Sequence, residues 1–245
     1  MIEIEGRKFS FGGVADPDEH RANGQRLDLP AVSGAPVLQD RLWYRDQLEN
    51  PTCTWQSIAG VVEAQTGRRV SAMQGWGDAR RWAGFPAGSS GGVSLVHGIL
   101  SLLHRGAADY VDGEDARPAV TPAPDRGAPS LASELSCVTF PRAQDLRIDT
   151  GGERRLQDIL SALHGGFGVL ITAAVSYKLC TAQPTDIVGV DTVGCPGGAM
   201  HTFRILGWDG ANWVPANSWG GAGEPLLRDE CLVSPFVTDI HALKL

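Results

Sequence analysis

A single cysteine, Cys53, stands at the end of a polar loop that contains Pro51 and directly precedes an expected helix. The N-terminus of a helix offers unpaired backbone N–H groups and a positive partial charge, and both favour a thiolate over a thiol. The thiolate is the form of cysteine that acts as a nucleophile. Cys53 is therefore a candidate nucleophile, and the alternative is a small buried apolar residue.

A thiolate nucleophile needs a base or cation beside it, commonly a histidine. Of the six histidines, His201 is the best placed, because it opens the strand-like run HTFRILGW after the glycine-rich turn CPGGAM. The others lie in expected helices or near the termini. Asn217 follows His201 by 16 residues, and the intervening turn DGAN predicts a hairpin that brings the two together. A neutral amide can hold the ring in one tautomer and orientation without adding charge.

Acyl transfer also needs hydrogen-bond donors for the developing oxyanion. Gln47 lies six residues before Cys53, so its amide could fold back over the sulfur. The backbone N–H of Cys53, at the start of the helix, would be the second donor. Gln47 is a candidate only because of its distance from Cys53.

Together these motifs resemble those of the papain-like cysteine peptidases. The order Gln, Cys, His, Asn in DQLENPTC, HTFRILGWDG and NWVPANSWG, and both spacings, match the family from about Asp46 to the C-terminus. The resemblance implies a two-lobed α+β fold, with a helical lobe that carries Cys53, an antiparallel β-barrel-like lobe that carries His201 and Asn217, and an active-site cleft between them. It also implies hydrolysis of a peptide or protein substrate by a Cys-His-Asn triad with Gln47 in the oxyanion hole, without cofactor or metal.

The resemblance assigns further roles. Gly91 and Gly92, in SSGGVSL, would pair with the substrate backbone, and Trp219 would shield the Asn–His contact within the substrate site. Cys195 and Cys231 are placed similarly to one structural disulfide of the secreted members, and the alternative is two free thiols. Because the five cysteines are odd in number, at least one thiol is free in a monomer.

The sequence also departs from the family pattern. PTCTW replaces the family's G-S-C-W, which indicates a distant bacterial or phage-type branch. Pro215 removes a strand N–H two residues before Asn217, so an edge or a bulge is expected there. The first 40 residues are too few for the family's long inhibitory propeptide, so none is expected.

Apolar periodicity predicts the elements that must position these residues. Helices are expected over 54–65, within 68–87 and over 91–106 and 153–166; strands are expected over 135–148, 167–175, 201–208 and 212–219. Residues 107–130, rich in Ala, Asp, Pro and Gly, are a candidate linker. We therefore expect one domain made of an N-terminal extension (1–40), a helical lobe (41–118) and a β-rich lobe (119–245).

Composition narrows the function classes. The 245-residue chain is 42% hydrophobic with a net charge of −7 and has no long basic run, so neither nucleic acid nor an anionic membrane is expected as a partner. The N-terminus lacks the pattern of a signal peptide, and a cytoplasmic or particle-packaged protein is expected. The alternative function is a structural or interaction protein of the same fold, such as a phage virion component in a large assembly. A thiol-redox protein is disfavoured because no CxxC pair is present.

Overall fold

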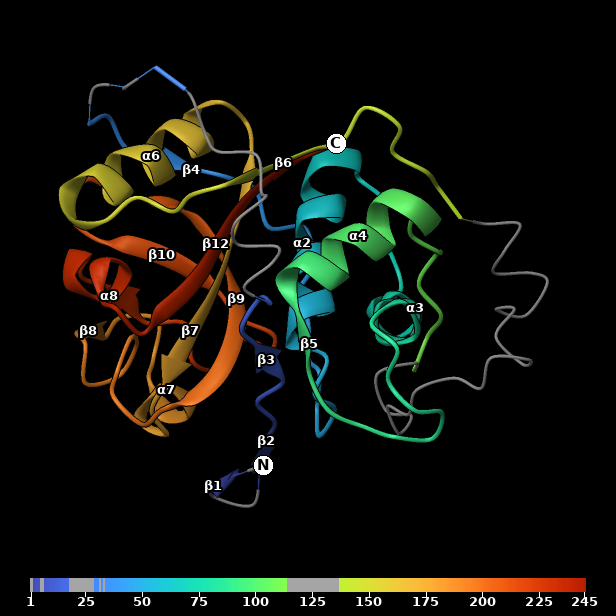
Figure 1. Cartoon of the computed structure of the whole chain (residues 1–245). Helices are drawn as coiled ribbons and strands as arrows, with labels where there is room; N and C mark the ends of the chain where they lie inside the picture. The colour runs from blue at the N-terminus through green and yellow to red at the C-terminus, as the bar shows by residue number, and fades with distance from the viewer. Residues whose placement is uncertain (1, 5–6, 18–28, 31, 33, 114–136) are drawn as a thin grey trace.

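The computed structural model describes residues 2–4, 7–17, 29–30, 32, 34–113 and 137–245. A group of helices packs beside a mostly antiparallel sheet (Figure 1). The helices are α2 (Cys53–Thr66), α3 (Ala72–Trp82), α4 (Leu95–Arg105), α6 (Gly152–His164), α7 (Lys178–Thr181) and α8 (Asp229–Val233). The strands are β1 (Ile2–Ile4), β2 (Arg7–Phe9), β3 (Gly13–Val14), β4 (Val37–Leu38), β5 (Val93–Ser94), β6 (Gln144–Arg147), β7 (Gly168–Val175), β8 (Ile187–Val188), β9 (Ala199–Trp208), β10 (Trp213–Ala216), β11 (Leu226–Leu227) and β12 (Val237–Lys244).

Helix α2 lies between the sheet and helices α3 and α4, so most of its side chains are buried. It begins at Cys53, shortly after Pro51, whose ring cannot continue a helix toward the N-terminus. It ends at Thr66 and is capped by Gly67, which takes the left-handed conformation (φ 70°) that glycine adopts without a steric penalty. The expected helix over 54–65 is confirmed, and the packing of α2 fixes the position of its first residue, Cys53.

The large sheet has eight strands, in the order β6-β12-β7-β9-β10-β11-β8, with β4 paired to β9 off this path. Strands β9 and β10 form the expected antiparallel hairpin. Their register shifts between Val214 and Pro215, which confirms the bulge that the proline predicts. The hairpin therefore holds His201 and the end of β10 on neighbouring strands.

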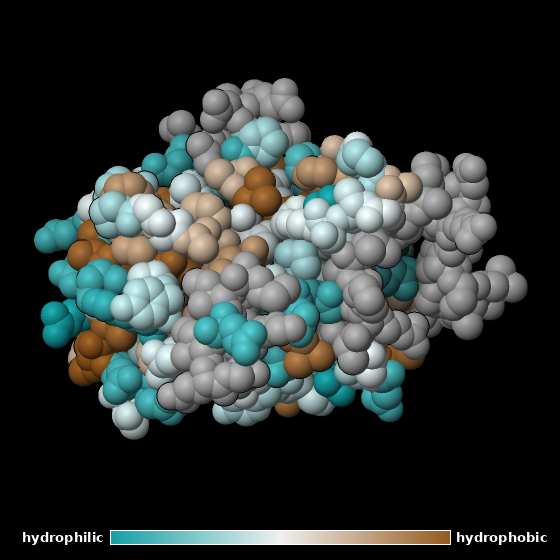
Figure 2. Space-filling view, turned by 90° about the horizontal axis from the view of Figure 1, so that it is seen from below, coloured by the Kyte–Doolittle hydropathy of each residue, from teal (hydrophilic) through white to brown (hydrophobic). Residues whose placement is uncertain are grey.

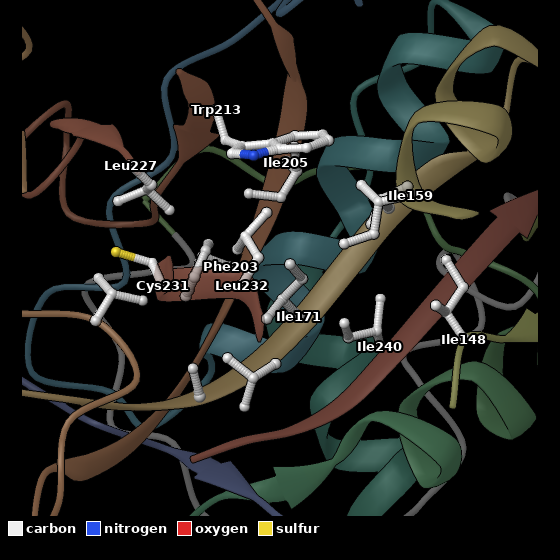
Figure 3. Packing of buried hydrophobic residues seen from close by; sticks show 14 of the residues in the cluster. Ile148, Ile159, Ile171, Phe203, Ile205, Trp213, Leu227, Cys231, Leu232 and Ile240 are labelled. Atoms are coloured by element: carbon white, nitrogen blue, oxygen red, sulfur yellow. The ribbon is translucent and has the colours of Figure 1, made fainter. Parts of the chain in front are cut away.

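Apolar side chains from the sheet, α6 and α8 form the core of the β-rich part. Figure 3 shows Ile171, Phe203, Ile205 and Ile240 pointing toward one another from β7, β9 and β12, with Ile159 of α6 beside them. A second core lies among α2, α3 and α4 and takes in Leu170 and Leu243 from the sheet. The two cores, one helical and one sheet-based, confirm the expected two-lobed α+β fold.

Two short strands near the N-terminus join this fold. Strand β3 pairs in parallel with β5, and β4 pairs with β9. In Figure 1, β3 lies between the sheet and the helices. The expected division at residues 40 and 118 stays a prediction, and most of the candidate linker, residues 114–130, lies outside the described part of the chain.

None of the described helices is long and apolar enough to cross a bilayer. On the face seen in Figure 2, apolar residues alternate with polar ones.

Candidate active site

The His201 ring, on β9, is held by Asn217, which follows β10. His201 Nε2 lies 2.7 Å from Asn217 Oδ1, and the amide is fixed in turn because its Nδ2 donates to the carbonyl of Gly223 at 3.0 Å. The Trp219 ring stacks on the imidazole with centroids 4.3 Å apart and an interplanar angle of 20°. The imidazole therefore has one orientation, and Nδ1 is the nitrogen left for chemistry.

Cys53 is the first residue of α2, and its side chain is fully buried. Its sulfur receives hydrogen bonds from backbone groups of Thr202, the residue after His201, and of Gly12. Burial raises the pKa of the Cys53 thiol, against the effect of these donors. In this state the sulfur is a neutral thiol at neutral pH.

The His201 ring is also fully buried, and burial lowers its pKa to about 4 against the opposing bond to Asn217. Its Nδ1 makes no hydrogen bond, to Cys53 or to any other described residue. The structure therefore brings Cys53, His201 and Asn217 to adjoining elements but holds the thiol and the imidazole in their uncharged forms. A thiolate–imidazolium pair would need water or a substrate in place of the groups that bury them.

Gln47 lies in the loop before α2 with its side chain fully buried. Its Oε1 accepts a hydrogen bond from Ser218, which directs its Nε2 to the carbonyl oxygens of Ser10 (2.8 Å) and Asn50 (2.9 Å). The turn that carries it includes Leu48, whose φ of 51° costs on the order of 1 kcal/mol in a non-glycine residue. An amide donor held in this way can bind a carbonyl oxygen, and here it binds that of Ser10.

Residues 10–16, called the covering segment below, lie across these groups. Phe11 contacts the rings of both His201 and Trp219 edge-on, with centroids 5.9 and 5.4 Å away. The carbonyl of Gly12 accepts a hydrogen bond from the N–H of Val93 at 3.2 Å. The covering segment thus accepts a hydrogen bond from the Gln47 amide and buries Cys53 and His201. The expectation that no long inhibitory propeptide precedes the lobes stays a prediction.

The covering segment can pack this closely because glycines occupy the positions where its backbone crosses neighbouring backbones. A Cβ on Gly12 would lie 2.2 Å from the Pro51 oxygen, and one on Gly92 would lie 1.8 Å from the Gly12 oxygen. The expected pairing partner, the Gly91–Gly92 stretch, therefore faces an extended backbone, that of the covering segment. Trp219 is 1% exposed beneath Phe11, so its expected role in binding substrate stays a prediction.

The far end of the covering segment is anchored by charge. Asp16 Oδ2 lies 2.8 Å from His241 Nε2, while His241 Nδ1 lies 2.9 Å from Asp145 Oδ1. The second Asp16 oxygen accepts the N–H of Val96 in the first turn of α4 at 2.9 Å. Burial lowers the pKa of His241, but Asp145 and Asp16 outweigh it and raise that pKa to about 10. Its imidazolium therefore pairs with two carboxylates at neutral pH.

Sequence reasoning missed this anchor and the covering segment. The glycine pair at 12 and 13 was the available signal, because consecutive glycines permit the close approach of two backbones. His241 was set aside for its place near the C-terminus, although β12 carries it into the interior.

The possible disulfide between Cys195 and Cys231 is not formed in the structure, where both are thiols. Cys195 Sγ lies 3.7 Å from the carbonyl of Ala174, and Cys231 Sγ lies 3.4 Å from that of Val188, so each thiol has its own acceptor. Within the described ranges, no group of three or more His, Cys, Asp or Glu side chains is arranged to hold a metal ion.

Comparison with solved structures defines the class of fold. The chain is similar to xylellain, a cysteine protease from Xylella fastidiosa, with a TM-score of 0.71 and 17% identity over 99% of each chain. It is also similar to digestive procathepsin L2 of Tenebrio molitor (TM-score 0.66, 16% identity, 97% of this chain and 78% of that one). A third similar structure is the bromelain protease of Ananas comosus in complex with the E64 inhibitor (TM-score 0.53, 14% identity, 84% and 94%).

At the level of sequence, no family profile matches the chain, and no curated protein does. The structural likenesses, all below 25% identity, show the fold. The chain has the papain-like cysteine protease fold, as the four ordered motifs predict.

Proposed function

We propose that the chain is a cysteine peptidase that hydrolyses peptide bonds, with Cys53 as nucleophile, His201 as proton carrier, Asn217 as the residue that orients His201, and Gln47 as oxyanion donor. The observation that carries the proposal is the 2.7 Å contact between His201 and Asn217, on a hairpin packed against the helix that begins at Cys53. Burial of an imidazole costs folding stability, whereas a neutral amide that fixes the ring orients it for proton transfer. The arrangement is therefore more typical of a catalytic histidine than of a structural one.

The proposed reaction begins when a substrate replaces the covering segment. His201 Nδ1 takes the Cys53 proton, and the thiolate attacks the scissile carbonyl carbon to form a C–S bond. The carbonyl oxygen becomes an oxyanion that accepts hydrogen bonds from Gln47 Nε2 and the Cys53 N–H. The C–N bond then breaks as the His201 imidazolium protonates the leaving amine. Water, deprotonated by His201, hydrolyses the thioester and returns the thiol.

In the full chain the covering segment competes with substrate. Its Ser10 carbonyl takes the Gln47 donor, and its backbone covers the sulfur. We therefore propose a peptidase whose turnover depends on displacement of residues 10–16. Nothing in the described part of the chain favours the alternative of a structural virion component.

The test is turnover of a fluorogenic peptide library by the full chain carrying Gly12→Ala, which the Pro51 contact should force out of its place. Adding Cys53→Ala should abolish turnover, whereas adding Cys137→Ala, at a thiol outside the site, should leave it unchanged. An epoxide thiol blocker should inhibit and should label Cys53. Turnover that survives Cys53→Ala contradicts the proposal, as does a folded Gly12→Ala chain that cleaves no library member.

A further inference from the structure

Three threonine hydroxyls form a row at the interface between α2 and the sheet, beside the proposed nucleophile. Thr54 is the second residue of α2, directly after Cys53. Thr202 follows His201 on β9, and Thr172 faces Thr202 across the β7–β9 pair. The Oγ1 atom of Thr202 lies 3.2 Å from that of Thr54 and 3.0 Å from that of Thr172. The row therefore joins the two elements that carry the proposed nucleophile and proton carrier.

Packing alone does not explain these hydroxyls. All three threonines are fully buried, where a valine of the same shape would pack without a polar atom. Leu170, two residues before Thr172 and on the same face of β7, belongs to the apolar core around α2. A buried hydroxyl costs free energy unless it is hydrogen-bonded, and the bond returns little net stability. Three such groups beside a sulfur therefore point to a chemical role.

The acceptors fix the direction of each hydrogen bond in the row. Thr54 Oγ1 donates to the carbonyl oxygen of Val93 at 2.7 Å, and a carbonyl has no proton to give. Since a hydroxyl has one proton, both remaining contacts are hydrogen bonds only if Thr172 donates to Thr202 and Thr202 donates to Thr54. The last of these is the longest, at 3.2 Å against about 2.8 Å for a typical bond between hydroxyls. The Thr202 proton is therefore the one most easily redirected.

The Cys53 sulfur is the other acceptor close to the Thr202 hydroxyl. After burial, the strongest influences on this sulfur are backbone groups of Thr202 and Gly12, followed by the hydroxyls of Thr202 and Thr54. All four lower the pKa of the thiol, and none of the four is charged. Thr202 is also fixed from the helix side, because the Ser57 hydroxyl on α2 donates to its carbonyl oxygen at 3.2 Å. Thr202 thus presents two donors, its N–H and its hydroxyl, to one sulfur.

We propose that the Thr202 hydroxyl turns from Thr54 to the Cys53 sulfur when the thiol loses its proton, and that it stabilises the thiolate together with its own backbone N–H. A hydrogen bond to an anion is stronger than one between neutral hydroxyls, so ionisation of the sulfur favours the rotation. The Cys53 proton goes to His201 Nδ1, and Thr202 keeps its own. Thr172 is a positioning residue, because its donated bond leaves the Thr202 proton free to turn. This role rests on the proposed function, in which Cys53 reacts as a thiolate.

The experiment measures the alkylation rate of Cys53 by iodoacetamide against pH, in the wild-type and Gly12→Ala chains. Thr202→Val keeps the side-chain shape and removes the donor. The midpoint of the profile should therefore rise by about one pH unit, and the rate well below the midpoint should fall about tenfold. Thr202→Ser, which restores a hydroxyl, should stay within about twofold of the parent chain. Thr66→Val, at the far end of α2, is the matched control and should leave the midpoint unchanged.

A double variant guards against an effect on folding. Thr202→Val alone leaves the Thr172 proton without its acceptor, and that cost could disturb the fold. Thr172→Val combined with Thr202→Val leaves no such proton. Its midpoint should rise as much as that of Thr202→Val.

An unchanged midpoint in the folded double variant would overturn the proposal. So would a rate that falls by the same factor at every pH, because that pattern reports lost packing and not a lost donor to the thiolate. Peptide turnover reads the proposed function separately. A Gly12→Ala chain that shows the midpoint shift with Thr202→Val but cleaves no peptide would contradict the peptidase and retain the role of Thr202.

Discussion

At the scale of single residues, the proposed oxyanion donor Gln47 offers a way to test nucleophile reactivity and catalysis separately. Its amide is directed by Ser218 toward carbonyl oxygens, and Gln47 is not among the groups that act most strongly on the pKa of the Cys53 thiol. Alkylation by iodoacetamide forms no oxyanion, whereas peptide hydrolysis does. The two reactions should therefore respond differently when this donor is removed.

We predict that Gln47→Ala, in the Gly12→Ala chain, lowers kcat for peptide hydrolysis by about 10²–10³ and changes the alkylation rate of Cys53 by less than about threefold. The measurement is steady-state kinetics beside mass-spectrometric alkylation of the same preparation. Equal losses in both would mean that Gln47 acts by holding the structure of the loop.

The candidate residues could be predicted from the sequence because each sits at a point that local signals mark. Cys53 comes between a proline loop and a periodic helix, and His201 and Asn217 flank a recognisable hairpin turn. Their charge states could not be predicted, since these depend on burial by Phe11 and Gly12, residues about 40 and 190 positions away in the chain.

At the scale of elements, the covering segment is held at both ends and is short between them. Ser10 bonds Gln47 at one end, and Asp16 bonds His241 and the first turn of α4 at the other. Only the two residues of β3 pair with β5. The Asp16 anchor should therefore control how often the covering segment leaves the Cys53 sulfur.

We predict that Asp16→Asn raises the alkylation rate of Cys53 in the full chain by about 30-fold, because losing a buried charged hydrogen bond worth about 2 kcal/mol shifts the opening equilibrium by that factor. Asp145→Asn is the matched control, since Asp145 faces the same His241 but lies on β6, outside the covering segment. If both variants raised the alkylation rate of Cys53 equally, the cause would be a general loosening of the fold and not release of the covering segment.

Most of the longer elements follow from sequence patterns, although strand β12 is not among those expected, and the shortest elements do not. Helices α2, α4 and α6 and strands β7 and β9 have clear periodicity or continuous apolar runs. Strands β3 and β4 have two residues each and form only because they pair with strands more than 75 residues away in the chain. No local signal can predict such pairs, so the N-terminal extension could not be placed from the sequence.

At the scale of the whole molecule, two buried histidines titrate in opposite directions. Burial lowers the pKa of His201 from 6.5 to about 4, so folding stability falls as the pH decreases from 6.5 toward 4, where the unfolded chain binds the extra proton. Asp145 and Asp16 raise the pKa of His241 from 6.5 to about 10 despite its burial, so its contribution is complete below 6.5 and is lost as the pH rises toward 10.

We predict that the unfolding free energy is greatest near pH 6.5 and declines on both sides, each histidine contributing a slope of up to about 1.4 kcal/mol per pH unit. The measurement is denaturant unfolding between pH 4 and 10. His241→Gln should flatten the alkaline side and His201→Gln the acid side. A His241→Gln profile parallel to that of wild-type across the range would contradict the pairing of His241 with Asp16 and Asp145.

The loss of stability below pH 6.5 should also favour displacement of the covering segment, because His201 binds a proton more readily once water reaches its ring. Acid should therefore loosen the covering segment before it unfolds the lobes. Chain-wide stability and the accessibility of Cys53 are thus linked through one imidazole.

The central claim is that Cys53 is an activated nucleophile that the covering segment masks. Its most direct test is the alkylation rate of each of the five thiols at neutral pH, mapped by mass spectrometry in wild-type, Gly12→Ala and Gly151→Ala chains. Gly151 is the control because a Cβ there meets no atom within 4 Å. We predict that Cys53 in Gly12→Ala reacts at least about tenfold faster than Cys137, the half-buried thiol, and that Cys53 stays slow in wild-type and Gly151→Ala. Cys53 reacting no faster than the other thiols in a folded Gly12→Ala chain would contradict the account.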